Sequence, residues 1–425
     1  IAIPNLAQDL QASAKMIGWM PTLYLLSSVI FMLPCGKIAD NYGRKRVYAF
    51  GLSLNALASL MCASASSIEW VLFWRFVQGA AGAMIFGIGV AIITSITPNN
   101  KRGMALGTSA ACVYIGLSAA PAVGGWLTEI WGWRAVFYSQ IPLVLLLLLS
   151  IKLFLHGEWK NDKKSSFDWG TGLFSLFAIC LVLGLSDLPT MTGWGLTLLS
   201  VISLGLFIIH QSKSRRPLIR VQMFLESRVF SLSLSTSFLM YASNFSLAFL
   251  LSLYLQYIKG LSPSHAGQIV LLQAVSMAIM APLSGKLSDK IQPRIIATFG
   301  CIIVMVSFFL LSLLSMDSSI TYISGSLLLL GVGFGLFSTP NNNAIMGAVD
   351  KNELGVASSS MNLSRTIGNL FGMSLVNLIV HYYLGDKTFS AQNSTALMST
   401  ISLAFNISLG CVVLASCISA LRGKA

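Results

Sequence analysis

Long apolar runs follow one another along almost the whole chain, and only short polar segments separate them. The run LVLLLLLSIKLFL, from Leu143 to Leu155, is typical. A helix needs about 20 apolar residues to cross the hydrocarbon core of a bilayer. Of the 425 residues, 55% are hydrophobic and 10% are charged, whereas a soluble domain carries about 25% charge. The runs therefore predict an all-α membrane protein and exclude a water-soluble domain.

We expect thirteen membrane spans from these runs. Gly and Pro residues within several of them do not argue against a helix, because neighbouring spans and water satisfy the freed backbone groups. The spans are centred on residues 15–35, 47–66, 70–93, 104–127, 134–155, 169–187, 193–210, 229–254, 266–285, 295–315, 319–343, 355–382 and 397–421.

The Lys and Arg residues predict how the spans are oriented. When the loop GKIADNYGRKR at 36–46 is placed in the cytoplasm, the alternate loops on that side collect most of the 27 basic residues. The opposite side holds only Lys15, Arg134, Lys259 and Lys387. An excess of basic residues on cytoplasmic loops is the rule for membrane proteins. The net charge of +13 is thus attributed to topology and not to binding of nucleic acid.

This orientation places the C-terminus in the cytoplasm and Ile1 on the outer side. We therefore expect a further helix before Ile1, which gives the full protein fourteen spans with both ends in the cytoplasm. The expected location is the plasma (inner) membrane.

One short motif occurs twice. GKIAD at 36–40 is echoed by GKLSD at 285–289, each at the cytoplasmic end of a span. Duplicated halves are common in secondary transporters. The predicted organisation is an N-terminal six-helix bundle that lacks its first helix (1–157), two inserted helices with a basic linker (158–222) and a C-terminal six-helix bundle (223–425).

Six motifs in order resemble those of the major facilitator superfamily, and within it the fourteen-span drug:proton antiporter branch. They are IAIP with GWMPTLYLL, GKIADNYGRKR, WRFVQGAAGA at 74–83, GLSAAPAVGG at 116–125, WGWRAVFYSQIPL at 131–143 and SRTIGNLFG at 364–372. The 116–125 motif departs from the family pattern at Ala120, where Gly is usual. The resemblance implies an exporter of lipophilic or cationic small molecules against inward proton flow, without enzymatic activity, cofactor or metal.

The repeated loop is a candidate conformational gate. Gly36 allows a close helix approach, while Asp40 lies within reach of Arg44 one turn later and can cap a neighbouring helix. The gate residues are Gly36, Asp40, Gly43, Arg44, Lys45, Gly285 and Asp289. We favour the first copy as the latch, because Gln292–Arg294 replace Gly43–Lys45 in the second. The alternative is a solvated loop whose charges serve topology alone.

Two cations fall within spans and therefore face protein or water. Arg75, with Gln78, is either a snorkelling structural residue or has the proton-relay or anion-pairing role that the resemblance implies. Arg365 is either a packing donor or part of a cavity wall.

Gly116, Pro121, Gly124 and Gly125 form the antiporter-type motif. We expect its proline to kink the helix and its glycines to allow a neighbour to approach closely. The alternative is the general abundance of Gly and Pro in membrane helices.

None of the 14 acidic residues falls at the middle of a predicted span. Coupling to protons needs a carboxylate that titrates within the cavity. We expect that residue in the helix before Ile1, with Glu129 and Asp187 as the fallback candidates.

Polar and aromatic residues within spans are the candidates for a substrate cavity. Aromatic faces suit lipophilic cations, although ordinary helix packing explains each residue equally well. They are Trp19, Tyr24, Tyr114, Tyr241, Asn244, Gln273, Asn341, Asn343 and Arg365. The expected partners of a monomeric chain are a small-molecule substrate, protons and the lipid bilayer. The alternatives are a transporter of one metabolite, organic anion or lipid, and a non-transporting membrane sensor or scaffold.

Overall fold

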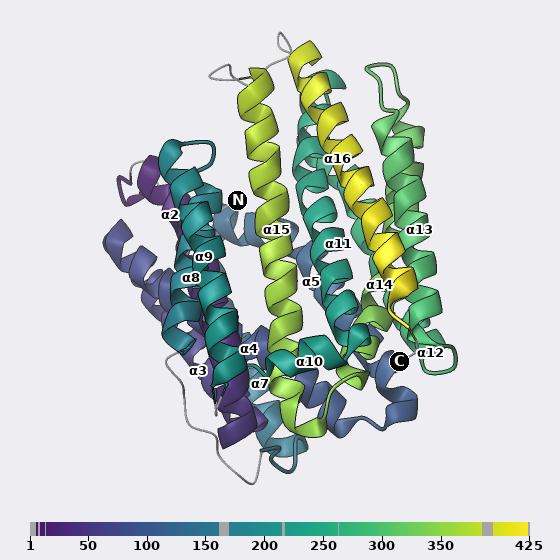
Figure 1. The fold of residues 1–425 in the computed structure, drawn as a ribbon. Helices are drawn as coiled ribbons and strands as arrows, with labels where there is room; N and C mark the ends of the chain where they lie inside the picture. Colours follow the sequence, from purple (N-terminus) through teal and green to yellow (C-terminus); the bar gives the residue numbers. More distant parts are fainter. Residues whose placement is uncertain are drawn as a thin grey trace.

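The computed structural model describes residues 6, 9–12, 14–160, 170–214, 217–261, 263–384 and 394–423. Ile1 and Lys387 lie outside these residues, and so do the side chains of Lys15 and Pro121. The described chain is helical apart from its turns and connections (Figure 1). The long helices are α2 (Ala14–Tyr42), α3 (Arg44–Ala63), α4 (Ile68–Ile96), α5 (Arg102–Trp131), α7 (Gln140–Phe154), α8 (Gly170–Ser186), α9 (Met191–Lys213), α11 (Arg228–Leu253), α12 (Pro263–Ser288), α13 (Pro293–Ser312), α14 (Ile320–Gly347), α15 (Leu354–Leu384) and α16 (Ser394–Leu421).

Short helices complete the described chain. They are η1 (Asn99–Lys101), α6 (Arg134–Tyr138), α10 (Val221–Glu226), η2 (Tyr254–Ile258) and η3 (Lys351–Glu353). Of these, η2 is a π-helical turn that extends α11, and η3 lies directly before α15.

The predicted spans agree with the helices. Within the described residues, 12 helical segments are long and apolar enough to cross a membrane, and the shorter helix Gly170–Ser186 is apolar as well. Together they coincide with the thirteen predicted runs. The all-α membrane fold is therefore confirmed.

Local signals in the sequence account for several helix starts. Ser67 accepts a hydrogen bond from the Trp70 amide at the start of α4, and Ser319 accepts one from the Tyr322 amide at the start of α14. These hydroxyls satisfy amides that have no partner within the helix. Pro293 stands at the first position of α13, where no amide donor is needed.

The helices form two groups that meet in two matching places. In the first group, α2, α3 and α4 pack on one another, α6 and α7 pack against α3, and α5 contacts α4 and α6. The second group is α11 to α16. Between the groups, α2 packs on α15 and α5 packs on α12 (Figure 1). The two copies of the repeated motif end α2 and α12, so each copy lies at one of these crossings.

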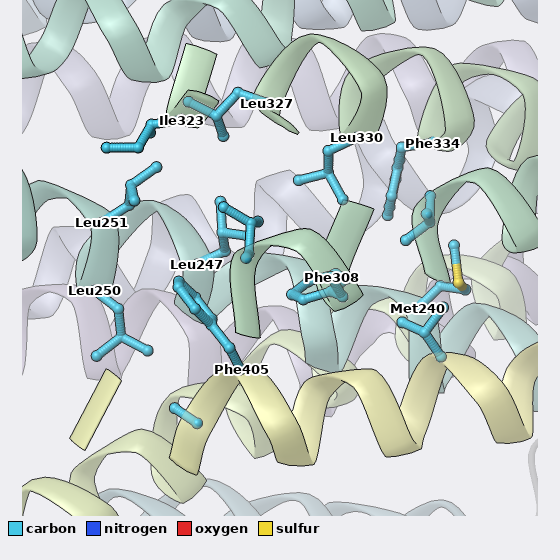
Figure 2. Packing of buried hydrophobic residues seen from close by; sticks show 14 of the residues in the cluster. Met240, Leu247, Leu250, Leu251, Phe308, Ile323, Leu327, Leu330, Phe334 and Phe405 are labelled. Atoms are coloured by element: carbon cyan, nitrogen blue, oxygen red, sulfur yellow. The ribbon is translucent and has the colours of Figure 1, made fainter. Parts of the chain in front are cut away.

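The C-terminal group has a continuous apolar core. Phe308 from α13, Phe334 from α14 and Phe405 from α16 converge there on Met240 and Leu247 of α11 (Figure 2). All five are buried. Close packing of this kind keeps the group rigid.

The inserted helices α8 and α9 pack on each other, and α8 also contacts α2 and α15 (Figure 1). They therefore lie against the crossing that carries the first copy of the motif. The proposed division at 157 and 222 remains a prediction.

Candidate functional site

Asp40 joins the two groups of helices. It ends α2 and is 2% exposed. Its Oδ1 accepts a hydrogen bond from the Gly355 amide at 3.0 Å, and its Oδ2 accepts one from the Val356 amide at 3.1 Å. These amides open α15, so the carboxylate caps a helix N-terminus that belongs to the other group.

Arg44 completes this cluster from the first turn of α3. Its Nε and Nη2 donate to Asp40 Oδ1 at 2.9 and 2.8 Å. It also donates to Ser95 Oγ on α4 and to the Lys351 carbonyl of η3, each at 2.7 Å. The guanidinium is 4% exposed, so one buried cation connects both groups at this end of the bundle.

Asp289 makes the equivalent cap at the second crossing. Its Oδ1 accepts from the Gly103 amide at 2.6 Å and its Oδ2 from the Met104 amide at 2.9 Å. These amides open α5. The second copy of the motif therefore also connects the two groups. Gly285 and Asp289 are among the predicted gate residues, although the first copy is the favoured latch. The second copy has Pro293 in place of Arg44 and so has no guanidinium at that position.

Glycines make both crossings possible. A Cβ at Gly36 would overlap the Gly355 carbonyl oxygen, and one at Gly285 would overlap the Gly103 carbonyl oxygen. The carboxylates reach the amides only because the helix backbones approach this closely. We refer below to these two crossings, each with its glycines and carboxylate, as the paired caps.

The segment after α7 caps α3 in turn. The Lys45 amide donates to Glu158 Oε1 at 2.9 Å, and the Arg44 amide donates to the Trp159 carbonyl at 3.0 Å. Gly43 precedes them with φ of 119°, a conformation that favours glycine. Lys45 itself donates to the Leu155 carbonyl through its side chain. Sequence analysis missed Glu158, because nothing in its local pattern marks a distant helix start.

A polar chain runs through the N-terminal group. Arg75 lies 4.9 Å from the centroid of the Tyr24 ring and donates to Gln78 Oε1 at 2.9 Å. Gln78 donates to Ser59 Oγ at 2.8 Å, and Ser59 donates to Gln140 Oε1 at 3.2 Å. The buried Arg75 Nε has no hydrogen-bond partner. Arg75 therefore faces protein, as expected for a cation within a span.

A cavity of about 420 Å³ lies between the two groups. Tyr114, Tyr241 and Arg365 line it. Polar residues that sequence analysis did not select line it as well, namely Ser109, Ser338, Asn342 and Asn362. Among its described lining residues, none is an acid.

Hydrogen bonds connect the two groups across this cavity. Tyr114 on α5 donates to Ser338 Oγ on α14 at 3.2 Å, and Asn362 on α15 donates to the Phe86 carbonyl on α4 at 2.8 Å. Arg365 donates to Asn342 Oδ1 at 2.6 Å and lies 5.1 Å from the Tyr241 ring centroid. This position of Arg365 agrees with the second of its two predicted roles, as part of a cavity wall.

The three consecutive asparagines of α14 point in different directions, because successive helical residues are rotated by about 100°. Asn341 donates to Ser237 Oγ at 2.9 Å, Asn342 lines the cavity and Asn343 donates to Ser288 Oγ at 3.2 Å. Only the middle asparagine reaches the cavity, and sequence analysis had selected the other two.

The other cavity candidates lie elsewhere. Gln273 of α12 donates to Asn244 Oδ1 of α11 at 2.6 Å, outside the lining. Tyr24 belongs to the polar chain of Arg75, and Trp19 is 36% exposed.

The antiporter-type motif shows a different packing from the one expected. α5 runs through residues 116–125 as one helix. No atom of the described residues lies within 4 Å of the position that a Cβ would take at Gly116 or Gly124. The expectation of close approach at these two glycines is therefore wrong for this conformation, because no neighbouring backbone reaches that face of α5. Gly125 is half-buried, and the side chain of Pro121 lies outside the described residues.

The fallback acids lie at the ends of helices. Glu129 is exposed near the end of α5. Asp187 follows α8, and the hydroxyls of Thr192 and Thr190 donate to its carboxylate and hold its pKa below the usual value. Within the described part of the chain, no group of three His, Cys, Asp or Glu is arranged to hold a metal ion.

Comparison with known proteins identifies relatives of the chain. The family described as Major Facilitator Superfamily matches residues 1–373. The uncharacterized transporter YebQ of Escherichia coli is 28% identical over 99% of this chain and 90% of its own length. The riboflavin transporter RibZ of Clostridioides difficile is 30% identical over 87% and 82%. The multidrug transporter protein MdtP of Bacillus subtilis is 28% identical over 91% and 72%.

Solved structures share the fold. The proton:xylose symporter XylE matches with a TM-score of 0.70 over 100% of this chain and 91% of its own, at 12% identity. The human organic anion transporter MFSD10 matches with a TM-score of 0.66 over 98% and 88%, at 13% identity.

Proposed function

We propose that this chain, which belongs to the major facilitator superfamily, is a secondary active exporter of lipophilic small molecules, driven by inward flow of protons across the plasma membrane. In this proposal the end of the bundle that carries the paired caps faces the cytoplasm. The two groups of helices rock about the cavity between them and expose it to either side in turn.

The paired caps are the observation that carries the proposal. Asp40 holds the start of α15, and Asp289 holds the start of α5. Both contacts cross from one group of helices to the other at the same end of the bundle, so they close that end. Their release would open the cavity to the cytoplasm, which is the step that loads an exporter.

Relatives support export of lipophilic molecules. MdtP of Bacillus subtilis and Stp of Mycobacterium tuberculosis carry names of multidrug transport and resistance, at 28% identity each. The cavity is lined largely by apolar and aromatic side chains. Such side chains bind lipophilic molecules of varied structure.

A dedicated transporter of one metabolite is the second candidate. The riboflavin transporter RibZ is a relative at 30% identity. The specific observation that favours this candidate is the cluster of Arg365, Asn342 and Tyr241 in the cavity wall, because convergent polar groups give selectivity.

We retain Arg75 and Gln78 as the proposed positions of proton coupling, since they lie inside the bundle, whereas Glu129 and Asp187 are exposed at helix ends. An Arg stays protonated at physiological pH. Arg75 would therefore orient a titrating group or water rather than carry the proton itself.

Flux measurements in proteoliposomes test the proposal. The purified protein is reconstituted and a pH gradient is imposed, with a panel of lipophilic dyes of either charge. Uptake that depends on the gradient and stops when a protonophore dissipates it is expected. Dye movement equal to that of protein-free liposomes for the whole panel would reject the proposal.

A further inference from the structure

The cavity between the two groups of helices contains a cation without a counter-ion. Arg365 is the charged residue among the described residues that line it. The structure gives its guanidinium an amide oxygen and an aromatic face, from Asn342 and Tyr241, and no carboxylate within the described chain. Its Nε is buried and has no hydrogen-bond partner among the described residues.

These contacts compensate the positive charge of Arg365 only in part. A buried charge is costly unless an opposite charge or several hydrogen bonds compensate it. One amide oxygen and one ring face compensate it in part. A ligand that brings an anionic group to Arg365 would supply the missing partner.

The rest of the lining is apolar and aromatic. Phe86, Val90 and Ile93 of α4 are among its apolar lining residues. The Tyr114 and Tyr241 hydroxyls are both within hydrogen-bonding distance of Ser338 Oγ, at 3.2 and 3.3 Å. Both tyrosines also line the cavity. The volume of about 420 Å³ lies in the usual range for small-molecule sites.

We propose that this cavity selects amphipathic organic anions, in which a carboxylate, sulfonate or phosphate group binds Arg365 and an aromatic body lies against Phe86, Tyr114 and Tyr241. A planar guanidinium binds such groups through two parallel N–H donors. The inference rests on the proposed function in taking the cavity as the transport site. It departs from the cationic substrates that the family resemblance implies.

A pair of dyes with one framework and opposite charge tests the proposal. Fluorescein is anionic and rhodamine 123 is cationic, and both carry a phenyl-substituted xanthene. Their binding to the full-length protein is measured by fluorescence polarisation in detergent, without any gradient. We expect fluorescein to bind at least about tenfold more tightly, as loss of a charged hydrogen bond costs that much or more.

Three variants locate the residues that give the selectivity, and a fourth is a control. Arg365→Gln is expected to weaken fluorescein binding by roughly tenfold to a hundredfold and to leave rhodamine 123 binding unchanged or stronger. Asn342→Asp keeps the arginine but neutralises it with a neighbouring carboxylate, and is expected to act in the same direction. Arg365→Lys keeps the charge without the planar donors and should be intermediate. Lys152→Gln removes an exposed cation at the end of α7 and should change neither dye.

The outcomes separate this inference from the proposed function. Equal or tighter binding of rhodamine 123 to the unmodified protein, or unchanged fluorescein binding in a folded Arg365→Gln or Asn342→Asp variant, overturns the anion site. A failure of gradient-driven flux leaves these equilibrium results intact and counts against the exporter alone.

Discussion

Asp40 receives four hydrogen bonds, two from Arg44 and two from the amides that open α15. Hydrogen bonds to charged groups are worth about 1.5–3 kcal/mol each. Loss of one partner of a buried pair costs more, about 3–5 kcal/mol, because the other charge is left uncompensated. The interactions of this one side chain are therefore strong enough to shift an equilibrium between two conformations whose free energies differ by a few kcal/mol.

Asp40→Asn is expected to reduce transport at least about tenfold while the amount of protein in the membrane stays the same. The amide keeps the shape of the side chain but loses the negative charge that compensates Arg44. The expected cost in free energy is above about 1.4 kcal/mol, which corresponds to a factor of ten in an equilibrium constant. Dye flux in vesicles, normalised to the amount of protein, measures the effect. Asp317→Asn is the control, since Asp317 is exposed in the loop before α14. Normal flux in the Asp40 variant would contradict the role of the cap.

Asp187→Asn is expected to leave the pH profile of transport unchanged between about pH 5.5 and 8. The hydroxyls of Thr192 and Thr190 lower the pKa of Asp187 from a reference value of about 3.9 for an unperturbed Asp. A carboxyl with a lowered pKa stays ionised above that pKa and loses its charge only as the pH falls through it. Flux at a series of pH values measures the profile. A shifted profile in the variant would restore Asp187 as a coupling residue.

Sequence reasoning at the scale of residues succeeded where partners are local. Asp40 and Arg44 are one helical turn apart, so their contact was predictable from spacing. The cap on α15 joins Asp40 to residues more than 300 positions away, and only the packing of the two halves decides that pairing. The cavity residues show the same limit. The sequence leaves two roles open for Arg365. It does not tell which of three consecutive asparagines, each rotated about the helix axis, faces the cavity, so Asn342 was not selected.

At the scale of elements, α2 with α15 and α5 with α12 form two crossings of one design. A glycine on each side allows the backbones to meet, and a carboxylate at the end of one helix caps the other. The sequence repeat predicted that two related elements exist. The predicted gate residues include Gly285 and Asp289, but the first copy is favoured there as the latch because the second has no equivalent of Arg44.

Gly285→Ala is expected to destabilise the crossing of α5 and α12, because its Cβ would overlap the Gly103 carbonyl oxygen. Overpacking of this kind costs about 1–3 kcal/mol. The thermal midpoint in detergent should fall. Gly267→Ala is a matched control on α12, where no atom lies within 4 Å of the new Cβ, and alanine is favoured over glycine in a helix by up to about 1 kcal/mol. Equal midpoints for the two variants would show that the crossing does not depend on Gly285.

At the scale of the whole molecule, the fold was largely readable from the sequence. The number and limits of the apolar runs predicted the helices, because a bilayer fixes the length of a span. The packing of α8 and α9 beside α2 and α15 was not readable, since apolar helices carry little information about their neighbours. The same holds for the open face at Gly116 and Gly124, where the motif predicted contact and the structure has none.

In the proposed mechanism the paired caps keep one end of the bundle shut, and transport requires their release. Spin labels at Lys152 on α7 and Lys290 after α12 report the separation of the two groups at that end, in a chain whose exposed Cys112 and Cys417 are replaced by serine. Pulsed electron paramagnetic resonance then gives the distribution of distances. The account predicts one dominant short distance with both caps intact, and a second, longer distance when Asp40→Asn and Asp289→Asn are combined. The same distribution in both proteins would contradict it.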